Sequence, residues 1–322
     1  MTEIPTRKLG TLNVPPIING LWQIANGSLT RDVTIDEMVS CMMEYSFKSL
    51  NAFDGADHYG PSEIIMGKHK IKTKNGGIYF TKYVPEMNNE ISFKITEKAI
   101  QRSLDRLQTD SIDLIQFHYW NYNDKDSYID ILKHLMILQK QGKIKNIGLT
   151  NFNTHNLKYI IDTIPDINIV SNQLPYSIID TRIENNMIPY CQKHNIGILT
   201  YGTVLGGFLS EKYLPKHNNK PKSRKDLHNV SLRRYYKIIM LWCNNKWELF
   251  EELLLILQEI GLKYNKTLTQ IGIKYILDKP CVIGCIIGCR LGISNHINDT
   301  IGLFDFKLSS KDITSINNIV KK

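Results

Sequence analysis

Eight short apolar segments recur along this sequence, and each is followed by a stretch with the residue spacing of a helix. Such repeated strand–helix units predict a parallel sheet. Eight units are the number that closes a (β/α)8 TIM barrel, whereas an open doubly wound sheet usually has about five or six strands. No Gly-x-Gly-x-x-Gly follows the first segment, which also counts against an open dinucleotide-binding sheet. We therefore predict a single barrel over residues 1–322, with strands over residues 17–21, 48–53, 78–82, 112–118, 145–150, 167–173, 196–201 and 281–287.

Helices are expected between these strands. Thr34 and Glu37 fit a capping box, and Ser62 has the position of an N-cap residue. Further helices are predicted over residues 92–107, 127–141, 154–162, 182–194 and 268–277. The helix over residues 92–107 is expected to bury one apolar face, formed by Ile95, Ala99, Ile100, Leu104 and Leu107.

Three segments lie outside the eight units. Residues 9–16 have the pattern of an N-terminal hairpin, and residues 309–320 that of a C-terminal helix. The excursion over residues 208–265, after the seventh strand, is too long for a simple loop in a compact domain. Its first part is polar and basic, while its second part is helical with Trp247, Phe250, Leu254 and Leu257 on one face. We expect a helix that packs onto the barrel, in a segment that is either part of a substrate lid or a solvated insert.

The composition restricts the partners of the chain. A hydrophobic content of 42% and a charged content of 22% are typical of a soluble globular protein. The net charge of +9 favours anionic partners, but no nucleic-acid-binding motif accompanies the densest basic stretch, residues 216–225. The sequence has no apolar run of about 18 residues and no apolar core of a secretion signal near its start. We expect no nucleic-acid or membrane partner and a cytoplasmic location.

The cysteines are too sparse for a disulfide framework, with six in 322 residues. Cys281, Cys285 and Cys289 are evenly spaced in a strand-like stretch, where this spacing would place all three on one face. A zinc or iron–sulfur site would need a fourth ligand and turns between the ligands. We therefore expect buried reduced thiols and no metal.

Polar side chains follow three consecutive predicted strands. Asp54 comes directly after the second strand, and Tyr59 lies in the loop that follows it. Lys82 and His118 end the next two strands. Because the carboxyl ends of parallel barrel strands meet at one edge, where active sites lie, these four residues are expected to come together there.

This set, with Phe-Asp-Gly-Ala-Asp-His-Tyr-Gly at residues 53–60, resembles the catalytic tetrad of the aldo-keto reductases. The resemblance extends from about residue 7 to about residue 308 and implies reduction of aldehydes or ketones to alcohols. Tyr59 is then the proton donor, and His118 binds the carbonyl of a small-molecule substrate. Lys82, held charged by Asp54, is expected to lower the pKa of Tyr59, since an ammonium within about 4–6 Å shifts a pKa by roughly 1–3 units.

The hydride must come from a nicotinamide, since no side chain can supply one. The resemblance implies NADPH/NADP+, with the carboxamide held by Thr150, Asn151 and Gln173 and the ring stacked on Tyr201. Glycines in residues 201–207 allow close approach of backbone to a pyrophosphate, which Lys212 would neutralise. Trp22 is expected beside the nicotinamide and, with Tyr119 and Trp120, in an aromatic wall of the pocket. The candidate cofactor-binding residues in this part of the chain are Trp22, Asp54, Thr150, Asn151, Gln173, Tyr201, Gly202, Thr203, Leu205, Gly206 and Lys212.

The loop after the eighth strand is a common phosphate site in such barrels. Aldo-keto reductases usually have Arg or Gln where His296 stands, and Glu-Asn where Asp299 and Thr300 stand. The chain therefore departs from the family pattern at the contacts to the 2′-phosphate and the adenine. Arg290 can compensate as a planar, always charged phosphate ligand, whereas His296 contributes only when protonated. We expect NADPH to be preferred over NADH.

Two other functions are compatible with parts of this pattern. Potassium-channel β subunits share the family, so the chain is alternatively a cofactor-binding regulatory module with little turnover. A metal-dependent barrel hydrolase would need several His and carboxylate residues at strand ends, but only His118 and Asp54 are so placed, which counts against this alternative. The sequence leaves the substrate and the oligomeric state open.

Overall fold

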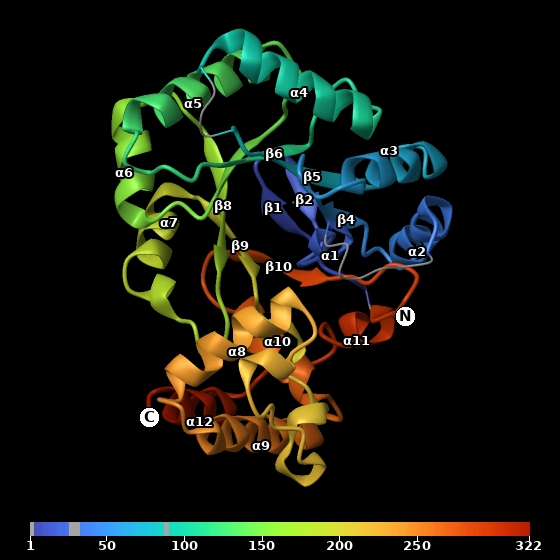
Figure 1. Ribbon diagram of the computed structural model, residues 1–322, viewed down its shortest axis with the longest axis vertical. Coiled ribbons are helices and arrows are strands. Elements are labelled where there is room, and N and C mark those ends of the chain that lie inside the picture. Colours follow the sequence, from blue (N-terminus) through green and yellow to red (C-terminus); the bar gives the residue numbers. More distant parts are fainter. Residues whose placement is uncertain (1–2, 26–32, 87–89) are drawn as a thin grey trace.

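In the computed structural model, which describes residues 3–25, 33–86 and 90–322, eight parallel strands close into a barrel (Figure 1). Neighbouring strands follow the order β10, β3, β4, β5, β6, β7, β8, β9, and β9 pairs with β10 to complete the circle. The predicted (β/α)8 barrel is thus confirmed, and every strand overlaps its expected segment. The strands are β3 (Ile17–Gly20), β4 (Ala52–Asp54), β5 (Ile78–Tyr83), β6 (Leu114–His118), β7 (Ile147–Thr150), β8 (Ile169–Pro175), β9 (Gly197–Tyr201) and β10 (Val282–Gly288).

Apolar side chains fill the barrel interior near the N-terminal ends of the strands. One hydrophobic cluster joins residues from seven strands, namely Ile18, Ala52, Phe80, Leu114, Val170, Leu199 and Ile286. The antiparallel hairpin of β1 (Arg7–Leu9) and β2 (Leu12–Val14) adds Leu9 and Val14 to it. The hairpin therefore closes the N-terminal end of the barrel, and the polar side chains lie nearer the opposite end.

Helices surround the barrel and make up most of the rest of the described chain (Figure 1). The capping box at Thr34 is confirmed, since its side chain accepts from the Glu37 amide and the Glu37 carboxylate accepts from the Thr34 amide. The helices are α1 (Trp22–Ala25), α2 (Ile35–Phe47), α3 (Ser62–Lys72), α4 (Phe93–Leu107), α5 (Lys125–Lys140), α6 (Thr154–Thr163), α7 (Met187–His194), α8 (Val230–Trp242), α9 (Trp247–Tyr264), α10 (Leu268–Leu277), α11 (Ile297–Ile301) and α12 (Ser310–Val320).

Several local expectations were wrong. The strand β4 begins at Ala52, because the chain turns at Ser49, which has a φ of 60°. Ser62 does not cap α3, because its hydroxyl donates to the Ala56 carbonyl at 3.1 Å. Ile95 faces solvent, with 38% of its surface exposed.

The helix expected over residues 182–194 is divided in two. A 3-10 turn spans Arg182–Glu184, and α7 begins only at Met187. Pro189 has no backbone N–H to donate, so it is tolerated in the first turn of a helix and not in its interior. This places the start of α7 just before Pro189.

The excursion over residues 208–265 contains two helices, of which the sequence predicted one. On α9 the expected apolar face is buried, with Trp247, Phe250, Leu254 and Leu257 each 0% exposed. This helix packs against α10 and α12 (Figure 1). The helix α8 was missed, and it lies against the turn at Leu205–Gly207.

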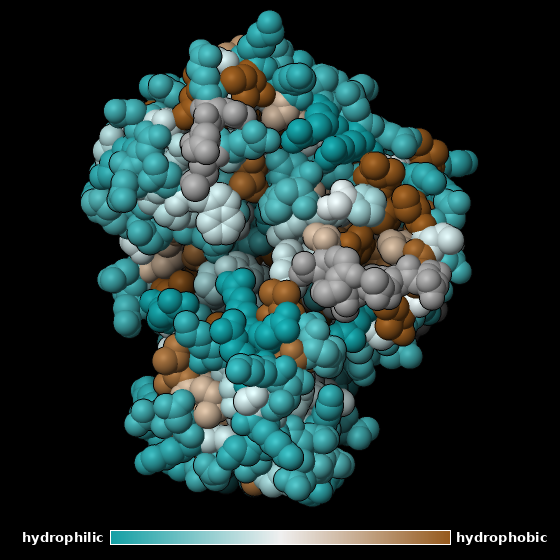
Figure 2. Space-filling model, in the orientation of Figure 1, coloured by the Kyte–Doolittle hydropathy of each residue, from teal (hydrophilic) through white to brown (hydrophobic). Residues whose placement is uncertain are grey.

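The surface in Figure 2 is largely hydrophilic, with apolar side chains gathered on the side where α2 and α3 lie. No helix in the described ranges is long and apolar enough to cross a membrane. Cys281 precedes β10, with a φ of 61°, so the prediction that three cysteines share one strand face was wrong. Among the described residues, no cluster of three or more His, Cys, Asp or Glu side chains is arranged to hold a metal ion.

Candidate active site

A buried ion pair joins two neighbouring strands near the carboxyl end of the barrel. Lys82 Nζ of β5 lies 2.6 Å from Asp54 Oδ2 of β4 and donates to the Gly55 carbonyl at 2.8 Å. Both residues are almost inaccessible, with 1% of Lys82 and 3% of Asp54 exposed. Burial works to lower the pKa of Lys82, but the negative charge of Asp54, with the nearby Tyr59, outweighs it and raises that pKa. The ammonium group is therefore charged at neutral pH.

Tyr59 stands over this ion pair. It lies in the loop between β4 and α3 and is half-buried, with Lys82 Nζ 5.0 Å from the centre of its ring. Burial raises the pKa of Tyr59, while the Lys82 ammonium opposes this rise. The net shift is upward, so the prediction of a lowered pKa was wrong in direction: desolvation of the phenolate outweighs its attraction to the ammonium. The hydroxyl accordingly holds its proton at neutral pH.

His118 ends β6 on the same edge of the barrel. Burial, with a smaller effect of the Lys82 charge, lowers its pKa to about 4, so the ring is neutral at pH 7. Its Nε2 lies 3.2 Å from Asn151 Nδ2, and its ring packs against that of Trp120 at 4.3 Å between centroids. A neutral imidazole can donate one hydrogen bond without bringing a charge into the site.

Two glutamines hold the second oxygen of Asp54. Gln116 Nε2 donates to Asp54 Oδ1 at 2.7 Å, and Gln173 Nε2 donates to the same atom at 3.0 Å. Gln173 also donates to Gln116 Oε1 at 2.7 Å. Gln116 was not predicted as a site residue, although it stands two residues before His118 and so points to the same face of β6. Gln173 was predicted to hold a nicotinamide, but in the structure its amide nitrogen faces Asp54.

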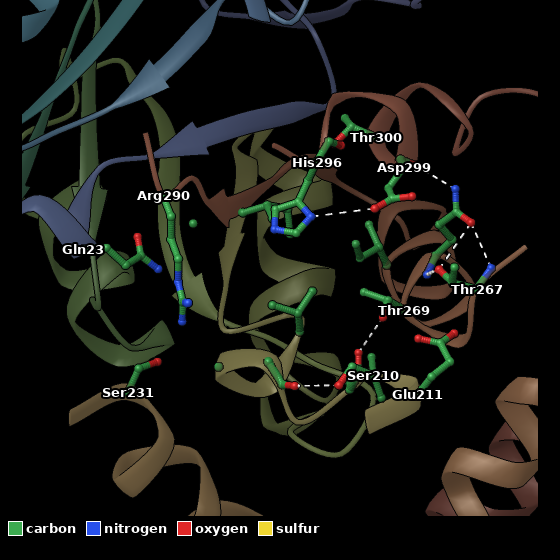
Figure 3. Close-up of a pocket in the computed structure, with 18 of the residues that line it drawn as sticks. Gln23, Ser210, Glu211, Ser231, Thr267, Thr269, Arg290, His296, Asp299 and Thr300 are labelled. Atoms are coloured by element: carbon green, nitrogen blue, oxygen red, sulfur yellow. Dashed lines mark hydrogen bonds and ion pairs between the residues drawn. The ribbon is translucent and has the colours of Figure 1, made fainter. Parts of the chain in front are cut away.

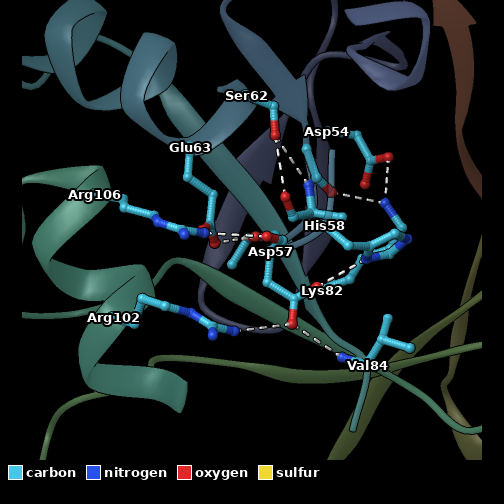
Figure 4. Close-up of polar contacts among 12 residues, drawn as sticks. Asp54, Asp57, His58, Ser62, Glu63, Lys82, Val84, Arg102 and Arg106 are labelled. Carbon is cyan, nitrogen blue, oxygen red and sulfur yellow. Dashed lines mark hydrogen bonds and ion pairs between the residues drawn. The ribbon is translucent and has the colours of Figure 1, made fainter. Parts of the chain in front are cut away.

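A second polar network supports the loop that carries Tyr59 (Figure 4). Arg106 of α4 donates to the Asp57 carbonyl at 3.1 Å and to Glu63 Oε2 at 3.3 Å. Glu63 is buried, and its other oxygen accepts from Thr81, the neighbour of Lys82, at 2.7 Å. Arg102 lies 3.7 Å from the Asp57 carboxylate. These contacts tie α3, α4 and β5 to the loop around Tyr59.

The ends of β7 and β9 supply further polar groups at the barrel mouth. Tyr201 donates to Asn151 Oδ1 at 2.8 Å, which joins Tyr201 to His118 through Asn151. Asn151 has a φ of 63°, a left-handed conformation that asparagine tolerates better than most residues. Thr150 is buried, and its hydroxyl has no hydrogen-bond partner among the described residues.

A cavity of about 390 Å³ begins beside Trp22 and extends past the end of β10 toward α10 and α11 (Figure 3). Of the predicted cofactor residues, the cavity is lined by Trp22, Gly206, Arg290, His296, Asp299 and Thr300. Lys212 does not line it, because its ammonium lies over the ring of Tyr213 at 5.3 Å. The Thr203 hydroxyl donates to the Tyr176 carbonyl at 3.2 Å, and Leu205 is fully buried. These three residues therefore do not present their side chains to the cavity.

The glycines at the start of the excursion pack against α8. Gly202 and Gly206 have φ values of 76° and 67°, and a Cβ atom on either would collide with Tyr235. We expected these glycines to allow approach to a pyrophosphate, but on this side the ring of Tyr235 occupies the space. Gly207, which lines the cavity, has nothing within 4 Å of the position of a Cβ atom.

A family model of the aldo/keto reductases matches residues 16–321. The chain belongs to the aldo/keto reductase family. An L-galactose dehydrogenase of Arabidopsis thaliana is 25% identical over 232 residues, which cover 67% of this chain and 70% of the relative. An NADH-specific methylglyoxal reductase of Escherichia coli strain K12 is 27% identical over 245 residues, covering 67% of this chain and 72% of the relative. A solved aldo/keto reductase from Klebsiella pneumoniae, in complex with NADP and acetate, has the same fold, with a TM-score of 0.70, 16% identity and coverage of 98% and 95% of the two chains.

The cavity of this aldo/keto reductase has features that fit a nicotinamide dinucleotide. Arg290 extends into it between Gln23 and His296 (Figure 3) and supplies a permanent positive charge for a phosphate. Gln23, which lines the cavity, has a buried Oε1 atom without a partner among the described residues, as expected where a ligand supplies the missing hydrogen bond. His296 Nδ1 lies 3.7 Å from Asp299 Oδ2, so these two residues face each other at the cavity wall.

Proposed function

We propose that this aldo/keto reductase is an NADP(H)-dependent carbonyl reductase in which Tyr59 donates the proton to the substrate oxygen. The observation that carries the proposal is the buried Asp54–Lys82 pair, at 2.6 Å, beneath the ring of Tyr59. Tyr59 holds a proton that it can give up, and Lys82 supplies the positive charge that stabilises the phenolate left behind.

The other residues of the site orient the carbonyl and keep the charges in place. His118 is neutral and lies at the same edge of the barrel as Tyr59. There it can donate a hydrogen bond to the carbonyl oxygen of the substrate. Its Nε2 is in contact with Asn151, so a substrate that binds to this nitrogen must displace that contact. Asp54, fixed by Lys82, Gln116 and Gln173, prevents the ammonium from turning away from Tyr59.

The cofactor, when bound, supplies the hydride for the carbonyl carbon. The residues that would hold it are Trp22, Thr150, Tyr201 and Gly206 toward the barrel mouth, and Arg290, His296, Asp299 and Thr300 toward α11. Relatives of this chain are named for different cofactors, since one is described as NADH-specific and one solved structure contains NADP. The presence of Arg290 in the cavity supports NADPH for this chain, because a guanidinium binds a phosphate through paired hydrogen bonds.

The deciding experiment is steady-state oxidation of NADPH and NADH with a panel of aldehydes and ketones. We expect turnover with NADPH and at least one carbonyl compound, and its loss in the Tyr59→Phe variant. A protein that binds NADPH tightly but turns over none of the panel would be a regulatory module, and the proposed activity would then be wrong.

A further inference from the structure

Arg234 of α8 stands at the barrel mouth, in contact with Tyr201 at the end of β9. Its guanidinium carbon lies 5.6 Å from the centre of the Tyr201 ring and 5.8 Å from that of the Tyr235 ring. Its Nη2 donates to the Tyr201 hydroxyl at 3.4 Å, and the side chain is exposed toward solvent. The planar cation therefore lies against aromatic rings while most of its N–H groups stay available.

The charge of Arg234 is not neutralised by the protein. No carboxylate in the described ranges lies within 4.0 Å of it. Arg182, which also lies near Tyr201, differs in this respect, because its Nε and Nη2 bind the two oxygens of Asp180 at 2.6 Å and 2.7 Å. Of these two arginines at the mouth, Arg234 is the one free to bind an external anion.

Contacts connect Arg234 to the site of chemistry. Tyr201 bonds to Asn151, and Asn151 contacts His118 at 3.2 Å. Burial works to lower the pKa of Arg234, but the neighbouring tyrosines, Tyr59 among them, outweigh it and raise that pKa, so Tyr59 also lies within electrostatic reach. Arg234 does not line the cavity that fits the dinucleotide, where Arg290 provides the cation.

We propose that Arg234 binds a carboxylate at the end of the substrate remote from its carbonyl, so that the enzyme prefers aldehydes or ketones that carry an acid group. This inference rests on the proposed carbonyl reductase function. A guanidinium matches a carboxylate in charge and in the spacing of two parallel hydrogen bonds. A phosphate dianion would need a second free cation at the mouth, and Arg182 is already paired with Asp180.

The test compares 4-carboxybenzaldehyde with its neutral amide, 4-carbamoylbenzaldehyde, under saturating cofactor. The two probes have similar size, so the ratio of their kcat/KM values reports recognition of the charge. We expect the carboxylate to be favoured in the parent enzyme. In Arg234→Met the ratio should fall by about 10- to 100-fold, the typical effect of losing a hydrogen-bonded charge. Arg234→Lys, which keeps the charge without the planar fork, should lie between the two.

Lys237→Met is the matched control, because it removes the same charge from an exposed position one turn along α8. We expect it to leave the ratio close to that of the parent. If Lys237→Met and Arg234→Met lower the ratio equally, the preference reflects the general charge of the helix, and the inference is wrong. It is equally wrong if Arg234→Met weakens NADPH binding and leaves the ratio unchanged, since Arg234 would then be a cofactor ligand.

A binding measurement separates failure of this inference from failure of the proposed function. Calorimetric titration with 4-methylbenzoate and its amide, in the presence of NADP+, involves no turnover because neither probe has an alcohol to oxidise. Tighter binding of the benzoate that is lost in Arg234→Met would support the carboxylate site even if no aldehyde were reduced. Reduction of neutral aldehydes without preference for the benzoate would overturn the carboxylate site and leave the reductase function intact.

Discussion

Gln116 Nε2 donates a hydrogen bond of 2.7 Å to Asp54 Oδ1, while Lys82 Nζ lies 2.6 Å from the other oxygen of the same carboxylate. Asp54 is thus held from both sides, by a neutral donor from β6 and by a cation from β5. Buried charges are costly unless they are paired and hydrogen-bonded. Gln116 therefore belongs to the structure that keeps Lys82 beneath Tyr59, and it acts through Asp54.

Replacing Gln116 with leucine should weaken this arrangement. Loss of a hydrogen bond to a buried carboxylate typically costs about 1.5–3 kcal/mol. We expect lower stability in urea unfolding and a roughly tenfold lower kcat, because Asp54 fixes Lys82 less firmly. Gln101→Leu is the matched control, since Gln101 bonds to Asp105 on the exposed surface of α4. Equal effects of the two substitutions would contradict a special role of Gln116.

Tyr59→Phe removes the proton and little volume. We expect kcat for carbonyl reduction to fall by about 10²–10⁴-fold, the usual contribution of a general acid, while fluorescence titration shows unchanged cofactor binding. Tyr275→Phe serves as a control, because its hydroxyl bonds to Asn317 of α12, outside the tetrad and the cavity. Turnover of the Tyr59 variant near that of the parent would place the proton donor elsewhere.

Arg106→Met should destabilise the protein more than Arg102→Met. Arg106 pairs with Glu63, which has 1% of its side chain exposed, so its loss leaves a buried charge without its partner. Such losses cost about 3 kcal/mol or more, which we reduce to about 2 kcal/mol because Arg106 itself is 34% exposed. Arg102 is 53% exposed and 3.7 Å from Asp57, and surface pairs of this kind contribute less than about 1 kcal/mol. Chemical unfolding of the two variants measures which of them loses more stability.

Arg290→Ala tests the cofactor preference. The guanidinium is expected to bind a phosphate that NADPH has and NADH lacks, so its loss should raise the dissociation constant of NADPH by about tenfold or more and that of NADH much less. Fluorescence titration with both cofactors measures this difference. Equal affinities of the parent protein for NADPH and NADH would show that the cavity does not distinguish them.

The stability of the protein should fall as the pH is lowered from about 6.5 to about 4. His69 is fully buried between α2 and β5, and burial lowers its pKa to about 4. In the unfolded chain histidine titrates near 6.5, so between these values the unfolded state binds more protons and gains stability relative to the folded state. Stabilisation by neutral His69 is complete above pH 6.5 and is reduced by about 1.4 kcal/mol per pH unit below it.

Unfolding free energies of the parent and of His69→Gln across this pH range provide the measurement. His118, with a pKa also lowered to about 4, adds to the same slope, so the variant should keep part of it. A slope in His69→Gln equal to that of the parent would show that His69 does not titrate as described. His69 accepts or donates bonds to Ser46 and Tyr79, at 3.1 Å and 2.8 Å, so absolute stability will also change, and the slope is the quantity to compare.

The order of strands and helices was predictable from the sequence because it depends on local patterns. Apolar runs, capping residues and three- and four-residue spacing are visible without long-range information, and they placed all eight barrel strands and the terminal helix. The same local patterns predicted that Asp54, Lys82 and His118 lie at strand ends. Parallel strands in a barrel bring such ends to one edge. The helix α8 (Val230–Trp242), which follows a polar basic loop, was not predicted. Gln116 was not predicted either, although the two-residue period of a strand relates it to His118.

The chemistry of the site depended on contacts between residues far apart in the chain. The upward shift of the pKa of Tyr59 results from burial, which is set by everything packed around the ring and outweighs the opposing charge of Lys82. The direction of the Gln173 side chain was decided by Asp54, which stands 119 residues earlier. Arg234 lies at the barrel mouth beside the ring of Tyr235, which packs against Gly202 and Gly206. The sequence determined which groups reach the active edge, because that follows from strand order, whereas desolvation and side-chain pairing are sums over spatial neighbours and were decided by the tertiary structure.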